Sequence, residues 1–98
     1  MEAIINKNGA ELNIALEGRL DTNTAPKLES VIEENCDGVT SLNLDFEKLE
    51  YISSAGLRVL LATQKKMAAL GKMKISNVCA DIMEVFDITG FSDILDIE

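Results

Sequence analysis

Residues 41–71 read SLNLDFEKLEYISSAGLRVLLATQKKMAALG and decide the fold class, because they join a strand pattern to a helix pattern. Apolar and polar residues alternate from Ser41 to Phe46, which predicts a half-buried β-strand. We expect residues 47–52 to form a short connector. From Ser54 to Leu70 the apolar residues recur at helical spacing, and the following Gly71 is a typical helix end. The stretch therefore predicts a strand that leads into a helix.

The residues before this stretch predict two further strands and one helix. Asn8-Gly9 is a hairpin-turn signal between residues 1–6 and residues 11–17, so these two segments should form antiparallel strands. We expect residues 18–21 to leave the sheet. Residues 22–38 then predict a helix, with a polar N-cap among the first three of them.

The residues after this stretch complete an alternating pattern. They predict a strand over 72–78, a helix over 80–89 and a last short strand over 94–97. Strands joined through a helix require crossovers, so the second to fourth strands should lie side by side and mostly parallel, with the first strand antiparallel at one edge. The sequence therefore predicts an α/β fold in one domain, residues 1–98. In it, helices pack on a mixed, mostly parallel sheet of four to five strands.

Composition limits the classes of partner. The chain has 98 residues, 47% of them hydrophobic, and a net charge of -8. Its nine basic residues are scattered and outnumbered by seventeen acidic ones, which argues against binding to nucleic acid or to anionic membranes. An acidic surface suits a basic protein partner or serves solubility alone. Neither a signal peptide nor a membrane-spanning stretch is visible, so we expect a cytoplasmic protein.

Several residue types needed for catalysis are missing. The chain has no histidine, which excludes a Ser-His-Asp triad and nearly all zinc-hydrolase sites. It also has no phosphate-binding Gly-x-x-x-x-Gly-Lys loop and no Gly-x-Ser-x-Gly turn. Cys36 and Cys79 are far apart in sequence, and we expect both to be small buried residues. We therefore expect no enzyme activity, no metal and no cofactor.

Two consecutive serines, Ser53 and Ser54, precede the central helix. One reading is that a serine simply caps the helix by accepting a hydrogen bond from its backbone. The other reading is a phosphorylation switch. A cap needs only one serine, the small Ala55 and Gly56 leave the turn open, and a helix N-terminus tolerates a phosphate well.

Asp21 opens a second loop that should lie at the same end of the sheet. It follows one predicted strand just as Ser54 follows the next, and sites in open α/β sheets lie at the carboxyl ends of strands. Asp21 either caps its own helix or contacts the serine loop or a partner.

These two loops resemble a known family. The pattern Gly18-x-Leu20-Asp21-x-x-x-Ala25-x-x-Leu28, followed by Ser53-Ser54-Ala55-Gly56-Leu57, resembles the STAS domain and, more narrowly, the anti-sigma factor antagonists. The resemblance covers essentially the whole chain. It implies that the unphosphorylated protein binds an anti-sigma factor serine kinase and so frees a sigma factor. Phosphorylation by that kinase disrupts the complex, and a PP2C-type phosphatase reverses it.

Carried over by position, the phosphoacceptor is Ser54, and Asp21 lies near the surface that binds the kinase. We expect the rest of this surface to come from the same loops: Thr22, Asn23, Ser53, Ala55, Gly56 and Arg58. The family often reads Asp-Ser-Ser/Thr-Gly-Leu, so Ser53 replaces an aspartate and becomes a rival phosphoacceptor. Many members add a helix after the last strand, which we expect here to be absent or short.

A different function is compatible with the same family. The chain would then be a STAS module without a switch, either an accessory subunit of a transporter or a stressosome-like scaffold. The neighbouring genes would discriminate the two readings. Permease genes favour the transporter role, and genes for a histidine-kinase-like ATPase and a sigma factor favour the switch.

Overall fold

A five-stranded sheet in the order β1-β2-β3-β4-β5 forms the centre of the protein. The computed structural model describes all residues 1–98. The strands are β1 (Glu2–Asn8), β2 (Glu11–Leu20), β3 (Ser41–Ile52), β4 (Lys72–Ser76) and β5 (Asp96–Ile97). The helices are α1 (Ala25–Asn35), α2 (Ser54–Leu70) and α3 (Ala80–Thr89), and a short 3-10 helix, η1 (Phe91–Asp93), precedes β5. The predicted order of elements is confirmed.

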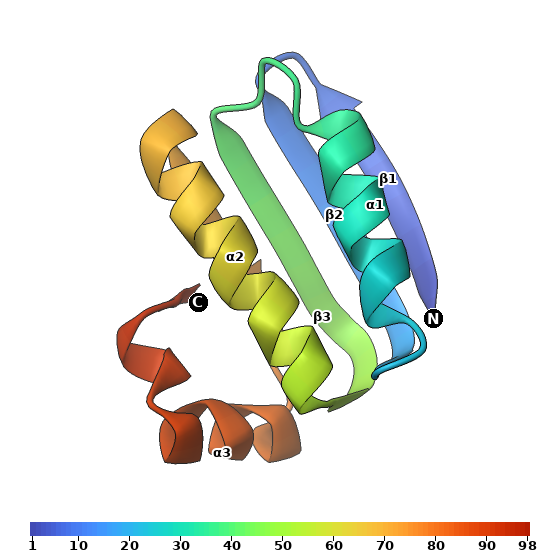
Figure 1. Ribbon diagram of the computed structural model, residues 1–98, viewed down its shortest axis with the longest axis vertical. Coiled ribbons are helices and arrows are strands. Elements are labelled where there is room, and N and C mark those ends of the chain that lie inside the picture. The colour runs from blue at the N-terminus through green and yellow to red at the C-terminus, as the bar shows by residue number, and fades with distance from the viewer.

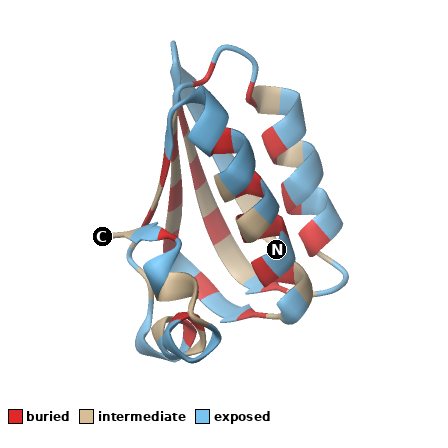
Figure 2. Cartoon of the chain, turned by 60° about the vertical axis from the view of Figure 1, so that its left-hand side comes forward, coloured by how far each residue is buried: buried red, intermediate tan, exposed pale blue.

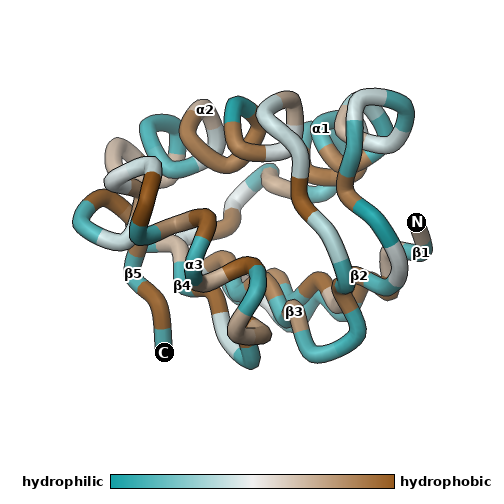
Figure 3. The backbone as a smooth tube through the Cα atoms, turned by 90° about the horizontal axis from the view of Figure 1, so that it is seen from below, coloured by the Kyte–Doolittle hydropathy of each residue, from teal (hydrophilic) through white to brown (hydrophobic).

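The directions of the first four strands are those that the sequence predicts. β1 is antiparallel to β2 at one edge, and β2, β3, β4 and β5 are parallel to their neighbours. Helices α1 and α2 lie side by side on one face of the sheet, and α3 lies across the end where β3 runs into α2 (Figures 1 and 3). The fold is therefore a mixed, mostly parallel α/β sheet.

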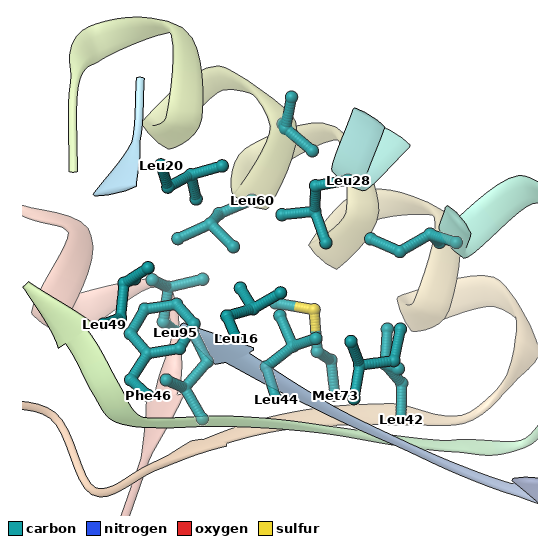
Figure 4. Packing of buried hydrophobic residues seen from close by; sticks show 14 of the residues in the cluster. Leu16, Leu20, Leu28, Leu42, Leu44, Phe46, Leu49, Leu60, Met73 and Leu95 are labelled. Atoms are coloured by element: carbon teal, nitrogen blue, oxygen red, sulfur yellow. The ribbon is translucent and has the colours of Figure 1, made fainter. Parts of the chain in front are cut away.

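Aliphatic side chains fill the space between the helices and the sheet. Leu16 and Leu44 of the sheet point toward Leu28 of α1 and Leu60 of α2 (Figure 4). All four are fully buried, whereas the outer sides of the helices are exposed (Figure 2). Burial of such side chains contributes roughly 1.5–3 kcal/mol each. This core holds the beginnings of α1 and α2 at a fixed position above the sheet.

Two strands are longer than the sequence predicts. Residues 18–20 belong to β2 and residues 47–52 belong to β3, so the expected exit from the sheet and the expected connector are both wrong. The β2–β3 ladder shifts register between Ala15 and Glu17 and again between Gly18 and Arg19. Such irregularities interrupt the period-two alternation by which a strand is recognised. The extra length carries both strands beyond β4, whose pairing with β3 ends at Ser76 and Asp45.

Three smaller observations bear on the remaining expectations. Cys36 is buried as predicted, but the expectation for Cys79 is wrong, because this N-cap residue of α3 is exposed. No three His, Cys, Asp or Glu side chains are grouped as they would be to hold a metal ion. No helix combines the length and the apolar character needed to cross a membrane.

Candidate functional site

The loops after β2 and β3 meet at one end of the sheet. The backbone N–H of Ser53 donates to the carbonyl of Leu20 at 2.9 Å, which ties the start of α2 to the last residue of β2. Seen from this end, the two segments rise side by side from the sheet to α1 and α2 (Figure 3). The structure thus brings together the two loops that the sequence singles out.

Ser53 and Ser54 have different roles at the start of α2. Ser53 is the N-cap, with extended backbone, and its Oγ accepts a hydrogen bond from the N–H of Gly56 at 3.3 Å. Ser54 is the first residue of the helix and is exposed, and its hydroxyl has no hydrogen-bond partner in the chain. The backbone N–H groups of Ser54 and Ala55 are likewise unpaired. The capping reading is therefore confirmed for Ser53, while the Ser54 hydroxyl is exposed and has no partner within the chain.

Asp21 organises the start of α1. Its Oδ1 accepts hydrogen bonds from the backbone N–H groups of Asn23 at 3.0 Å and Thr24 at 3.1 Å. Thr24 is the N-cap by position, but its hydroxyl makes no cap bond and donates instead to the carbonyl of Arg19 at 2.8 Å. Both donors precede the first turn of α1, because Thr24 is the N-cap residue and Asn23 lies before it, so Asp21 closes the turn that leads into the helix. Asp21 therefore stabilises the turn before α1 but is not its cap; it makes no hydrogen bond to the serine loop, and its contact with a partner stays a prediction.

These contacts lower the pKa of Asp21. Partial burial alone would raise the pKa, but hydrogen bonds from Thr24 and Asn23, with the nearby Arg19 guanidinium, outweigh it. The pKa of this carboxyl in the folded protein therefore lies below its ordinary value of 3.8. A carboxylate whose pKa is depressed on folding stabilises the folded state at higher pH.

A pH series tests this role of Asp21. Asp21 stabilises the protein above pH 3.8, and this contribution is lost as the pH falls through the lowered pKa. Asp21→Asn should therefore have a lower melting temperature than wild type at pH 7. Between pH 5 and about pH 2, the melting temperature of Asp21→Asn should fall by less than that of wild type. Thermal melts by circular dichroism measure both, with Asp93→Asn as a control for one lost charge. Parallel pH profiles for wild type and Asp21→Asn would contradict the assignment.

Two residues beside the site, Arg19 and Tyr51, were not predicted from the sequence. The guanidinium of Arg19 lies 4.1 Å from the centre of the Tyr51 ring, and its Nε lies 3.9 Å from Oδ2 of Asp21. Arg19 and Tyr51 face each other in the ladder only because of the register shift before Arg19. Both side chains are exposed, and Tyr and Arg are enriched in protein interfaces. No local pattern in the sequence pairs them.

A shallow groove between α1 and α2 is lined by further residues that the sequence predicts for the binding surface. Thr22, Ala55 and Arg58 line it together with Ala25, Pro26, Glu29, Val59 and Ala62. Asn23 is exposed in the adjoining loop. Two walls of the groove thus come from the two loops and helix starts that the sequence predicts to form one surface.

Gly56 has a different role from the one expected. It is buried, and a Cβ atom there would lie 2.8 Å from Cγ of Leu20 and 2.9 Å from Cγ1 of Ile52. Its small size therefore allows α2 to approach the sheet closely and does not keep the serine turn open. The exposed surface of this turn comes from Ser54 and, in part, from its neighbours Ser53 and Ala55.

Comparison with known proteins gives a consistent result. The family model for the STAS domain matches residues 3–98. The anti-sigma-B factor antagonist of Bacillus subtilis is 32% identical over 93 residues, which cover 94% of this chain and 84% of that protein. The putative anti-sigma factor antagonist BtrV of Bordetella bronchiseptica is 33% identical over 96 residues, covering 96% and 83%.

A solved structure shares the fold. The anti-sigma factor antagonist from Mycobacterium paratuberculosis superposes with a TM-score of 0.87 at 22% identity, over 98% of this chain and 83% of that one. At 22% identity this similarity shows a shared fold, that is, the same arrangement of strands and helices.

Proposed function

The chain belongs to the STAS domain family and, within it, to the anti-sigma factor antagonists, and from this membership we propose that Ser54 switches its binding to an anti-sigma factor. The unphosphorylated protein binds an anti-sigma factor that is also a serine kinase, and this releases a sigma factor in the cytoplasm. The observation that carries the proposal is the free, exposed hydroxyl of Ser54 beside the groove between α1 and α2.

The start of α2 is suited to a phosphate. The positive end of the helix dipole and the unpaired N–H groups of Ser54 and Ala55 favour negative charge. The first turn of α2 contains no acidic residue that would repel it. A phosphate on Ser54 therefore changes the surface by about -1.5 to -2 charges at pH 7 without opposing the fold.

The chemistry of the switch is supplied by its partners. Ser54 Oγ attacks the γ-phosphorus of ATP bound to the kinase, ADP leaves, and the hydroxyl proton passes to a base of the kinase. A PP2C-type phosphatase hydrolyses the resulting ester with water, which restores the hydroxyl and releases inorganic phosphate. The chain itself acts by binding and performs no catalysis.

The phosphate acts on binding through charge. Docking places the start of α2, the Asp21 loop and the groove between α1 and α2 against the kinase. A phosphate within this contact must lose water and meets the charges of the partner, and an unpaired buried charge is costly. The neutral hydroxyl of Ser54 carries no such cost, so only the unphosphorylated form binds tightly.

Phosphosite mapping tests the proposal and chooses between the two serines. After incubation with the kinase and ATP, mass spectrometry should find the phosphate on Ser54, because the Ser53 hydroxyl already serves as the cap. Ser54→Ala should abolish phosphorylation. Ser53→Ala should still be phosphorylated, although losing the cap should destabilise the protein by about 1 kcal/mol. Phosphate on Ser53 alone would refute the assignment.

A further inference from the structure

Arg58 lies one helical turn after Ser54 on the same side of α2. Both side chains are exposed, and residues four apart on a helix have Cβ atoms about 5–6 Å from each other. A negative residue followed four positions later by a positive one is the favourable order for such a pair. A phosphate on Ser54 would therefore come within reach of the Arg58 guanidinium.

Arg58 is uncommitted in the unphosphorylated protein. The two ion pairs of the structure, Arg19 with Asp21 and Lys74 with Glu98, do not involve it, and its side chain makes no hydrogen bond. It lines the groove between α1 and α2, where Glu29 of α1 is the one acidic residue. No bond within the chain must break for Arg58 to turn toward the start of α2.

We infer that Arg58 pairs with phosphorylated Ser54 and acts as the positioning residue of the switch. This inference rests on the proposed function, which places the phosphate on Ser54. The guanidinium and the free N–H groups of Ser54 and Ala55 hold the phosphate against the first turn of α2. Phosphorylation then has two effects on the docking surface. It adds negative charge, and it withdraws the positive charge of Arg58 from the groove.

Phosphorus NMR of protein with phosphoserine inserted at position 54 during translation tests the pairing. Arg58 favours the doubly charged phosphate, so it lowers the second pKa of the phosphoserine. Arg58→Gln should raise that pKa by about 0.15 to 0.4 units, and Arg58→Lys should restore most of the wild-type value. Because phosphoserine is already present, the measurement needs no kinase.

Lys65→Gln provides the matched control. Lys65 lies on the same helix eleven residues after Ser54, about 16 Å along the axis and close to the same face. It is also exposed, and its loss changes the net charge by the same amount. At an ionic strength of about 0.15 M this distance exceeds the screening length of about 8 Å, so the phosphoserine should titrate as in wild type.

The outcomes separate this inference from the proposed function. Identical titration of the phosphoserine in Arg58→Gln and Lys65→Gln would overturn the pairing and leave the switch at Ser54 untouched. A raised pKa in Arg58→Gln alone would support the pairing even if no kinase modified Ser54. Circular dichroism of each variant establishes that its fold is intact, as expected for substitutions of exposed residues.

Discussion

Phosphorylation of Ser54 should weaken binding to the anti-sigma factor kinase by about 100-fold, and Ser54→Asp should weaken it in the same direction relative to Ser54→Ala. Ser54 is exposed at the start of α2, in the surface that we propose to contact the kinase, so the added charge would lie within this contact. Like charges and unpaired charges across an interface cost several kcal/mol, and each 1.4 kcal/mol corresponds to about a tenfold change. Calorimetry or surface plasmon resonance with the purified kinase measures the affinities.

Ser53→Asp is the control for this experiment. It adds the same charge one residue earlier, but aspartate is as good an N-cap as serine and can accept the hydrogen bond from the N–H of Gly56. The bond to Gly56 turns this carboxylate toward the backbone of α2 and away from the surface proposed to contact the kinase, so the affinity of Ser53→Asp should stay within a few-fold of wild type. Equal affinities of Ser54→Asp and Ser54→Ala would refute the switch. Equal losses in Ser53→Asp and Ser54→Asp would show a general charge effect without a specific role for Ser54.

Gly71→Ala should produce the largest loss of stability among single-methyl additions. A Cβ atom at Gly71 would lie 1.9 Å from the carbonyl oxygen of Thr40, which accepts the hydrogen bond from the N–H of Lys72 at 2.9 Å. Because the obstacle is backbone at the start of the β3–β4 ladder, no side-chain rotation relieves it. We expect a loss of at least about 3 kcal/mol in the free energy of unfolding, measured by urea denaturation.

Gly90→Ala distinguishes this clash from the general cost of replacing a glycine that ends a helix. Gly90 closes α3 with a φ of +81°, and a Cβ atom there would meet nothing within 4 Å. The only cost is that of the left-handed conformation, about 1 kcal/mol. A loss in Gly71→Ala no larger than that in Gly90→Ala would contradict the role of the Thr40 contact.

The sequence predicts those parts of the site whose structure depends on one short segment alone. Ser53 and Ser54 stand directly before a helical pattern, so a cap and an exposed neighbour follow from sequence. The roles of Gly56 and Asp21 were not predictable in this way. The space at Gly56 is limited by Leu20 of β2 and Ile52 of β3. Asp21 binds the backbone of the turn before α1, and the Thr24 hydroxyl donates to the carbonyl of Arg19 instead of capping the helix.

The sequence by itself determined the order of elements and the place where the two loops must lie. Alternation and helical spacing are local properties, and crossover connections between parallel strands leave few ways to arrange them. Only the tertiary structure decided the lengths of β2 and β3, because register shifts erase the alternation. It also added Glu29, Val59 and Ala62 to the groove, because contacts between α1 and α2 depend on how both helices pack on the shared core.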